Sequence, residues 1–227
     1  PMKTAIILAA GSGTRAGGKL PKQLQTISGK PMFLHSVERF REVDPETEII
    51  LVINESYRDE FLRAIGGMKL TVTSGGASRL ESVSHALRLV PDVPGHLVAV
   101  HDAARPLVDT TLIQRGWKTA EEYGAAVPCV PLSDSIRTLE ADGSKAADRS
   151  RFVAVQTPQV FDAPMLKRAY AAIAGMTERE RTVLTDDASV VESAGGAVRL
   201  YDGDTKNMKV TGPADREIAE TIYRLIR

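Results

Sequence analysis

The sequence predicts a three-layer α/β fold in which helices cover both faces of a mostly parallel sheet. Short apolar runs, each long enough for one buried strand, alternate with segments whose apolar residues recur at helical spacing. The first run, 5–10, contains only Ala, Ile and Leu, and it leads directly into a glycine-rich loop. Alternating strand and helix signals are typical of parallel sheets with crossover helices.

The first 130 residues supply most of the predicted sheet. Pro31 opens a segment of helical period, and Ser78 and Glu81 have the spacing of a capping box at the start of another helix. Further helices are expected around 61–65 and over 112–123. The predicted strands lie at 5–10, 49–53, 70–72, 97–100 and 125–130.

The C-terminal part continues the alternation with weaker signals. A helix near 165–173 precedes a polar stretch through Asp187 and another short helix. Strands are expected around 198–201 and 208–210, and a terminal helix is expected from Pro213. No repeat or linker interrupts the chain, so we expect a single domain over 1–227.

The segment 133–155 has a different pattern. Ile136 and Leu139 alternate with polar residues, and Asp142-Gly143 is a hairpin turn signal. Such a hairpin buries little apolar surface within its own subunit. It is therefore either a β-hairpin arm that packs on a second chain in a homodimer or a solvated surface hairpin.

The composition excludes several classes of partner. The chain has 227 residues, 29 Lys and Arg against 29 Asp and Glu, and one cysteine. A formal net charge of zero without runs of like charge gives no reason to expect nucleic acid or a membrane surface as a partner. No apolar stretch is long enough to span a bilayer. Lone Cys129 suits a reducing compartment, so we expect a soluble cytoplasmic protein.

The loop 11–22 combines glycines with three cationic side chains, Arg15, Lys19 and Lys22. Glycines after a parallel strand let backbone amides approach phosphate oxygens, so the loop is a candidate polyphosphate cradle. The dinucleotide and P-loop patterns match it only weakly. The dinucleotide pattern requires a helix that begins directly after the glycines, and Pro21 disfavours one there. The P-loop pattern requires a Ser or Thr hydroxyl at the position that Leu20 occupies. A glycine-rich connector with solvated charges is the alternative.

The second candidate constellation is 101–106, His-Asp-Ala-Ala-Arg-Pro, directly after a predicted strand. Asp102 could hold a divalent metal or a substrate hydroxyl, and Arg105 could bind a phosphate. The alternative is that Asp102 and Arg105 pair with each other across a turn.

With these motifs in place, the chain resembles GT-A-like nucleotidyltransferases, and within them the 2-C-methyl-D-erythritol 4-phosphate cytidylyltransferase family. The opening loop specifies only the superfamily, whereas the later motifs are more specific. Two departures are Asp187, where many members have Glu, and Ser135, where some have Thr. The resembling segments are 8–15, 21–23, 75–79, 82–83, 101–106, 157–159, 185–189 and 207–211.

This resemblance implies a Rossmann-like sheet and the transfer of a nucleotide to a phosphorylated acceptor. CMP would pass from CTP to the phosphate of 2-C-methyl-D-erythritol 4-phosphate, releasing pyrophosphate, in non-mevalonate isoprenoid biosynthesis. Mg²⁺ or another divalent cation would neutralise the triphosphate, with Asp102 as a candidate ligand. The resemblance also implies that the arm crosses to the neighbouring subunit of a homodimer.

The resemblance assigns roles to residues as well. The catalytic cations would be Arg15, Lys22, Arg149 and Lys209, with Arg149 supplied by the partner's arm. The nucleotide would contact Ala9, Ala10, Gly11, Gly13, Gly75, Gly76, Ser82 and Asp102. The acceptor would contact Asp102, Arg105, Ser135, Thr157, Thr185 and Thr211. Each of the hydroxyl residues could instead serve a turn or a helix cap.

Three other functions stay open on the sequence. A cytidylyltransferase for another phosphopolyol, such as ribitol 5-phosphate, would keep the loop and change the acceptor pocket. A dinucleotide-dependent reductase would need a helix directly after Gly13. A nucleotide-binding module without catalysis would have no need of transition-state cations. It is therefore disfavoured by the combination of Arg15, Lys22, Asp102, Arg149 and Lys209.

Overall fold

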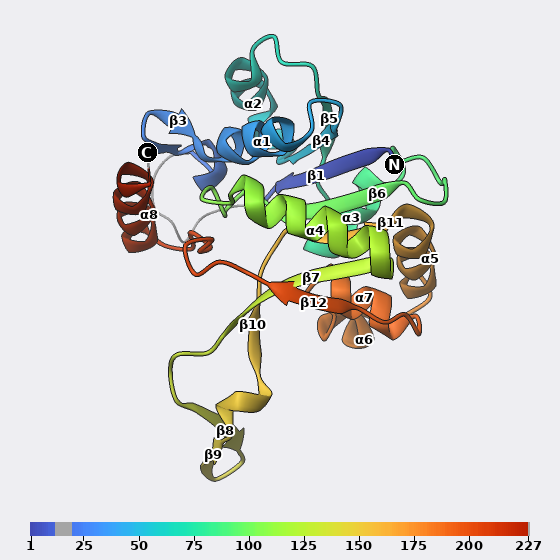
Figure 1. Cartoon of the computed structure of the whole chain (residues 1–227), viewed down its shortest axis with the longest axis vertical. Coiled ribbons are helices and arrows are strands. Elements are labelled where there is room, and N and C mark those ends of the chain that lie inside the picture. Colours follow the sequence, from blue (N-terminus) through green and yellow to red (C-terminus); the bar gives the residue numbers. More distant parts are fainter. Residues whose placement is uncertain (12–19, 227) are drawn as a thin grey trace.

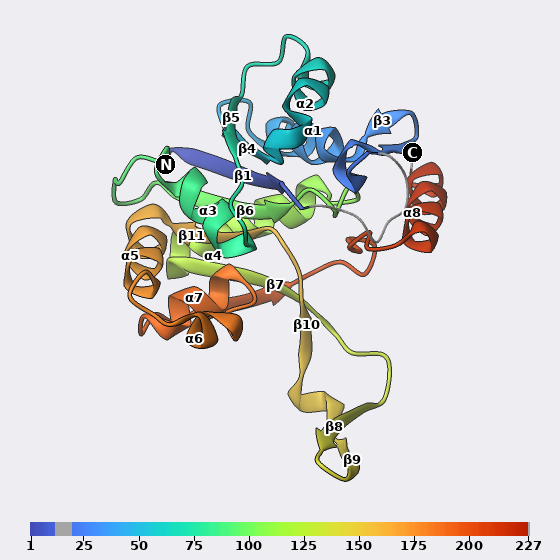
Figure 2. The same cartoon turned by 180° about the vertical axis from the view of Figure 1, so that it is seen from behind.

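The central feature of the computed structural model, which describes residues 1–11 and 20–226, is an eight-stranded sheet between two layers of helices (Figures 1 and 2). Its order is β10-β7-β11-β6-β1-β4-β5, and β12 pairs with β7. The strands are β1 Lys3–Ala9, β4 Glu48–Ile53, β5 Thr71–Ser74, β6 Leu97–Asp102, β7 Ala125–Pro131, β10 Val153–Val155, β11 Gln159–Asp162 and β12 Arg199–Asp202.

The strand pairing confirms the mostly parallel sheet, and it also shows antiparallel pairs around β7, β10 and β11. β1 pairs in parallel with both β4 and β6, and β4 pairs in parallel with β5. β11, which the sequence did not predict, lies antiparallel between β6 and β7. The strand expected at 208–210 does not form. The segment is held as a loop, in which the Val210 amide donates to the Ala104 carbonyl at 2.8 Å.

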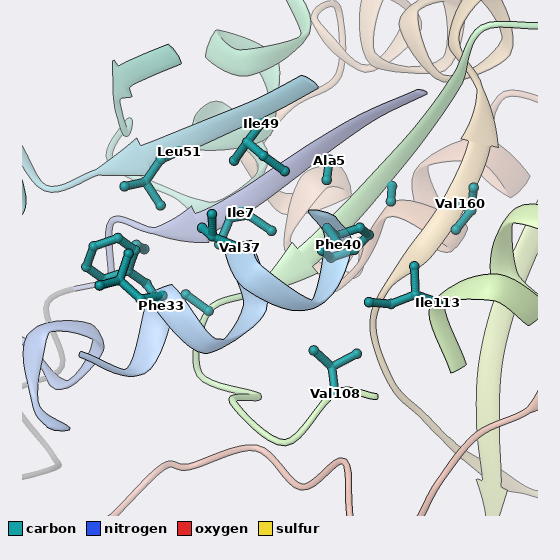
Figure 3. Packing of buried hydrophobic residues seen from close by; sticks show 14 of the residues in the cluster. Ala5, Ile7, Phe33, Val37, Phe40, Ile49, Leu51, Val108, Ile113 and Val160 are labelled. Atoms are coloured by element: carbon teal, nitrogen blue, oxygen red, sulfur yellow. The ribbon is translucent and has the colours of Figure 1, made fainter. Parts of the chain in front are cut away.

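Helices cover both faces of the sheet. Helices α1, α2 and α4 enclose one apolar core, which includes Phe33, Phe40 and Leu51 (Figure 3), and α3, α5 and α7 enclose the other. No helix in the described part of the chain is long and apolar enough to cross a membrane. The helices are α1 Met32–Val43, α2 Arg58–Ile65, α3 Arg79–Leu87, α4 Thr110–Tyr123, α5 Ala163–Ile173, α6 Glu178–Thr182, α7 Asp187–Ser193 and α8 Pro213–Leu225.

Local sequence signals explain where several helices begin and end. The Ser78 side chain accepts a hydrogen bond from the Glu81 amide at the start of α3, but the Glu81 carboxylate binds the Ala77 amide, so the capping box is half formed. Gly124, at φ 81°, ends α4 in the left-handed conformation that glycine adopts without strain. Helix α8 packs beside the small β2–β3 ribbon, Thr26–Ile27 and Lys30–Pro31.

The hairpin β8–β9, Ile136–Glu140 and Gly143–Ala147, projects away from the domain as an arm (Figures 1 and 2). Its stem returns to the sheet through β10, which pairs with the end of β7. Apolar side chains on the arm and its stem are exposed, with Leu139 at 86% and Phe152 at 50%. The predicted hairpin is therefore confirmed, whereas its role in dimerisation stays a prediction.

Candidate active site

A cavity of about 590 Å³ lies at the carboxyl ends of the parallel strands β1, β4 and β6. Open α/β sheets bind their ligands at this edge, because loops and helix N-termini present backbone amides there. The residues lining the cavity are Leu8, Ala10, Gly11, Lys22, Gln23, Asn54, Gly76, Ala77, Ser78, Arg79, Ser82, Asp102, Ala104, Lys209 and Thr211.

One wall of the cavity is the loop between β5 and α3. A Cβ at Gly75 would lie 2.3 Å from the Ala10 Cβ, so only glycine lets this loop approach the end of β1. The Gly76 amide donates to the Ser82 hydroxyl, 3.1 Å, and that hydroxyl donates to the Ser78 carbonyl, 2.9 Å. These bonds keep the glycine pair and the first turn of α3 in one rigid arrangement beside the cavity.

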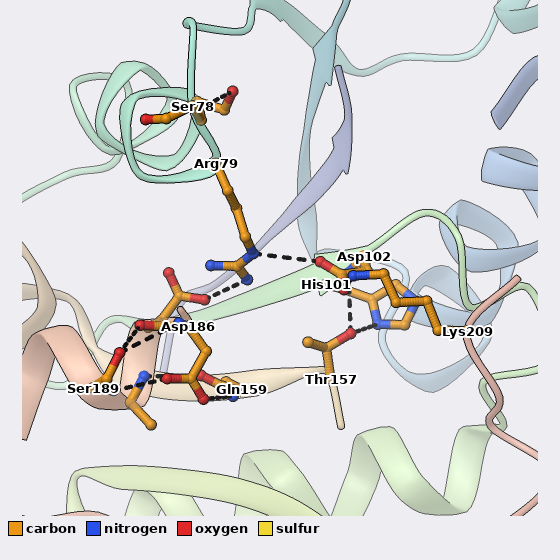
Figure 4. Close-up of polar contacts among 12 residues, drawn as sticks. Ser78, Arg79, His101, Asp102, Thr157, Gln159, Asp186, Ser189 and Lys209 are labelled. Atoms are coloured by element: carbon orange, nitrogen blue, oxygen red, sulfur yellow. Dashed lines mark hydrogen bonds and ion pairs between the residues drawn. The ribbon is translucent and has the colours of Figure 1, made fainter. Parts of the chain in front are cut away.

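Asp102 is the charged centre of the opposite wall (Figure 4). Its Oδ2 accepts a hydrogen bond from Lys209 Nζ at 2.8 Å, and its Oδ1 lies 3.6 Å from Arg79 Nε. Burial would raise the pKa of the Asp102 carboxyl, but the charges of Arg79 and Lys209 outweigh burial and hold that pKa well below its usual range. Asp102 is therefore ionised at any pH at which the protein would act.

Asp102 is the last residue of β6, and its backbone is held by Thr157, two residues before β11. The Asp102 amide donates to Thr157 Oγ1 at 3.0 Å, and the same hydroxyl lies 3.1 Å from His101 Nδ1. His101 is fully buried, and this burial lowers the pKa of its imidazole to about 4. His101 is thus a neutral hydrogen-bonding group at pH 7, and Thr157 acts on Asp102 rather than lining the cavity.

Lys209 reaches the cavity from a loop tied to 101–106. Arg105 Nη1 donates to the Asn207 carbonyl at 2.8 Å, and Asn207 Nδ2 donates to the Thr157 carbonyl at 2.8 Å. Asn207 is fully buried. The two motifs that the sequence separates by 100 residues therefore form one hydrogen-bonded unit, although Arg105 itself does not line the cavity.

Lys22 and Thr211 complete the cavity on the side of α8. Lys22 opens a short 3-10 helix, Lys22–Leu24, directly after Pro21. The Thr211 hydroxyl and amide both donate to the Asp215 carboxylate in the first turn of α8. Lys22, Arg79 and Lys209 then give the described lining three cationic side chains against one carboxylate, which favours an anionic ligand.

The structure brings many of the predicted site residues together and separates others. Ser135 and Arg149 lie on the arm and Thr185 is an exposed residue before α7, so within one chain none of them lines the cavity. Gly13 and Arg15 lie outside the described residues. The predicted residues that line the cavity are Ala10, Gly11, Lys22, Gly76, Ser82, Asp102, Lys209 and Thr211; those packed close behind it are Ala9, Gly75, Arg105 and Thr157.

Three polar lining residues, Gln23, Asn54 and Arg79, had no role assigned from the sequence. Asn54 directly follows β4, and its Oδ1 accepts a hydrogen bond from the Ser56 amide at 3.0 Å. Arg79 follows the Ser78 cap at a helix N-terminus beside a glycine pair and lies in the family-like segment 75–79, so the sequence marked its position without giving it a role.

The residues that line the cavity are compatible with a magnesium ion that is bound mainly by the phosphates of a nucleotide. Asp102 is the only carboxylate among the described lining residues, and the described part of the chain contains no group of three or more His, Cys, Asp or Glu placed to hold a metal. Magnesium is usually bound through one or two carboxylates together with substrate phosphates. Asp102 could supply the one carboxylate, in competition with Lys209.

The fold and the cavity together define a class of protein. A glycine-lined, cation-rich cavity at the carboxyl edge of parallel strands is the site of α/β proteins that bind nucleotides through their phosphates.

Comparison with known proteins then identifies the family. The protein-family model described as "IspD: 2-C-methyl-D-erythritol 4-phosphate cytidylyltransferase" matches residues 3–225 of the sequence. The chain therefore belongs to this family of nucleotidyltransferases. The protein of that name from Bacteroides thetaiotaomicron is 38% identical over 224 residues, covering 97% of this chain and 99% of that protein. Its counterpart from Symbiobacterium thermophilum is 41% identical, covering 96% and 92%. The crystal structure of the Thermus thermophilus enzyme superposes with a TM-score of 0.75 at 29% identity, covering 98% and 100%.

Proposed function

We propose that this protein transfers CMP from CTP to 2-C-methyl-D-erythritol 4-phosphate and releases pyrophosphate, as a step of non-mevalonate isoprenoid biosynthesis. The observation that carries this proposal is the cavity at the edge of the parallel sheet, which Lys22, Arg79 and Lys209 line together with one ionised carboxylate, Asp102. Membership of the cytidylyltransferase family supports the same reaction, and both curated relatives described above carry the name of that enzyme.

The proposed chemistry is an in-line displacement at the α-phosphorus of CTP. An oxygen of the acceptor phosphate forms the new P–O bond, and the bond to the β-phosphate breaks, so pyrophosphate leaves with the electron pair. The attacking phosphate is already ionised near neutral pH, so no general base is required. Catalysis then consists of positioning and charge neutralisation, for which Lys22 and, from outside the described residues, Arg15 are proposed.

A divalent cation, taken to be Mg²⁺, would neutralise the triphosphate and assist the departure of pyrophosphate. Asp102 is the residue proposed to contact it. The glycine loops provide the rest of the nucleotide site. Its proposed members are Ala9, Ala10, Gly11, Gly13, Gly75, Gly76 and Ser82.

The acceptor is proposed to bind beside Asp102 and Lys209, which both line the cavity. The Lys209 ammonium would bind the acceptor phosphate, and the Thr211 hydroxyl lies on the same cavity wall. Arg105 and Thr157 would act mainly by holding this wall in place, since their hydrogen bonds go to the Asn207 carbonyl and to Asp102. Thr185 would reach the acceptor only if its segment moves toward the cavity.

A homodimer would bring Ser135 and Arg149 to the acceptor site of the neighbouring subunit. The exposed apolar side chains of the arm, Leu139 and Phe152 among them, support burial against a second copy. A cytoplasmic location stays a prediction from the lone cysteine.

The reaction is tested by pyrophosphate release in the presence of magnesium. CTP, UTP and ATP should each be combined with 2-C-methyl-D-erythritol 4-phosphate, with ribitol 5-phosphate and with no acceptor. We expect release only from CTP with the methylerythritol phosphate. Faster release with ribitol 5-phosphate would contradict the acceptor but keep the reaction type, and no release from any pair would contradict the proposed enzyme.

A further inference from the structure

A buried chain of hydrogen bonds runs from α5 to the edge of the cavity. The Tyr170 hydroxyl donates to Asp187 Oδ1 at 2.6 Å, and Arg79 Nη2 donates to Asp187 Oδ2 at 2.7 Å. Asp187 is 0% exposed and Tyr170 is 7% exposed. Both oxygens of a fully buried carboxylate are thus occupied, which fixes the plane of the Arg79 guanidinium.

The same guanidinium faces Asp102 with a different nitrogen. Nη2 binds Asp187, while Nε lies 3.6 Å from Asp102 Oδ1. Because the guanidinium is planar and rigid, anchoring one nitrogen on Asp187 determines where the other meets Asp102. Arg79 therefore connects the first turn of α3, beside the glycine pair, to the end of β6.

The two cations on Asp102 differ in how firmly they are held. Arg79 belongs to a helix and has a buried carboxylate as a second partner, whereas Lys209 lies on a loop with its side chain 42% exposed. The flexible lysine can leave Asp102 more easily than the anchored arginine can. If Lys209 left, Arg79 would be the side chain that still pairs with Asp102, which is only 9% exposed and whose charge is costly to leave uncompensated.

We propose that Arg79 is a positioning residue: anchored by Asp187 and Tyr170, it keeps Asp102 in place while Lys209 releases that carboxylate and binds the acceptor phosphate. This inference rests on the proposed function, in which Lys209 contacts the acceptor. The Lys209–Asp102 ion pair is then the state of the site before the acceptor binds, and Arg79 makes the exchange of partners possible.

The proposal predicts a selective effect of Arg79→Gln. Without Arg79, Asp102 keeps Lys209 as its remaining ion-pair partner, so Lys209 becomes less available to the acceptor. We expect the KM for the acceptor phosphate to rise at least about tenfold, while the KM for CTP changes less than about threefold. Arg88→Gln, at the exposed C-terminal end of the same helix, is the matched control and should leave both constants unchanged.

A double-mutant cycle with Lys209→Gln separates this role from a general structural one. If Arg79 acts by freeing Lys209, the Arg79 substitution should raise the acceptor KM much less in the Lys209→Gln background than in the wild-type chain. Equal rises in the two backgrounds, or a rise in the KM for CTP as large as that for the acceptor, would overturn the proposal.

Arg79→Gln leaves Asp187 without its cation, so the variant could lose stability. Arg79→Gln combined with Asp187→Asn removes both buried charges and retains a hydrogen-bond acceptor for Tyr170. This double variant should show the same selective rise in the KM for the acceptor. A wild-type KM for the acceptor in the double variant would overturn the proposal. A wild-type protein without CMP transfer would show instead that the proposed function has failed.

Discussion

Lys22 is the residue whose removal tests the proposed transition state most directly. It lines the cavity at the start of the Lys22–Leu24 3-10 helix, where its charge would neutralise the phosphates of the nucleotide. We expect Lys22→Ala to lower kcat by about 100- to 1000-fold, the usual cost of losing a preorganised group that stabilises developing charge. Steady-state pyrophosphate release measures this effect, with the thermal unfolding midpoint confirming the fold.

Lys118→Ala, an exposed lysine on α4, is the control for that experiment and should retain wild-type kcat. A near-normal kcat in Lys22→Ala would contradict the assignment of Lys22 to the phosphates.

Individual site residues could be predicted from the sequence where a motif follows a strand or a helix cap. They could not be predicted where their role depends on a contact between distant parts of the chain. Asp102 and Ser82 could be placed because each follows a recognisable strand or cap. Arg79 could not be assigned, since its importance comes from Asp187, a residue 108 positions away that only the folded chain brings close. Nothing in the sequence alone specifies such a pairing.

The loop between β5 and α3 illustrates how an element depends on one glycine. A Cβ at Gly75 would meet the Ala10 Cβ at 2.3 Å, so Gly75→Ala must push the loop away from the end of β1. We expect a loss of about 1–3 kcal/mol in the free energy of unfolding and weaker CTP binding. Urea unfolding and calorimetric titration with CTP measure the two effects.

Gly67→Ala provides the comparison, because a Cβ there would meet nothing within 4 Å. If both alanine variants lost the same stability, crowding against Ala10 would not be the cause.

The elements themselves were predictable where a long apolar run or a clear cap marked them. Strand β1 is an example of an unbroken apolar run, and helix α4 is an example of a helix marked at both ends, by the Asp109 cap and by Gly124. β11 was missed because its four residues form a strand only by filling the space between β6 and β7. Met208 to Val210 has an apolar alternation typical of a strand, yet it forms a loop, and Val210 is buried in one hydrophobic cluster with Ala219 of α8.

For the whole molecule, buried histidine makes stability depend on pH. The pKa of His101 falls from 6.5 to about 4 because burial penalises its charged form. Between pH 7 and pH 5 the unfolded chain therefore gains a proton that the folded chain does not, and unfolding becomes easier. His101 alone should lower the free energy of unfolding by about 2 kcal/mol over this range. Urea unfolding at both pH values should show a smaller drop in His101→Asn, and an unchanged drop would contradict the assignment.

The arm connects the shape of the molecule to its proposed activity. Arg149 lies on the arm, outside the cavity of its own chain, and its guanidinium donates a hydrogen bond to the Ser133 carbonyl. If the arm crosses a two-fold axis, each active site combines Lys22 of one chain with Arg149 of the other.

Mixing two inactive variants tests this arrangement. A heterodimer of Lys22→Ala and Arg149→Ala chains would contain one site with both cations intact and one site with neither. After unfolding and refolding an equal mixture, about half of the dimers should be mixed, so about a quarter of wild-type turnover should return. Neither variant alone should recover, and a mixture that stays inactive although sedimentation shows dimers would place Arg149 outside the partner's site. A wild-type chain that sediments as a monomer at full activity would contradict the shared site altogether.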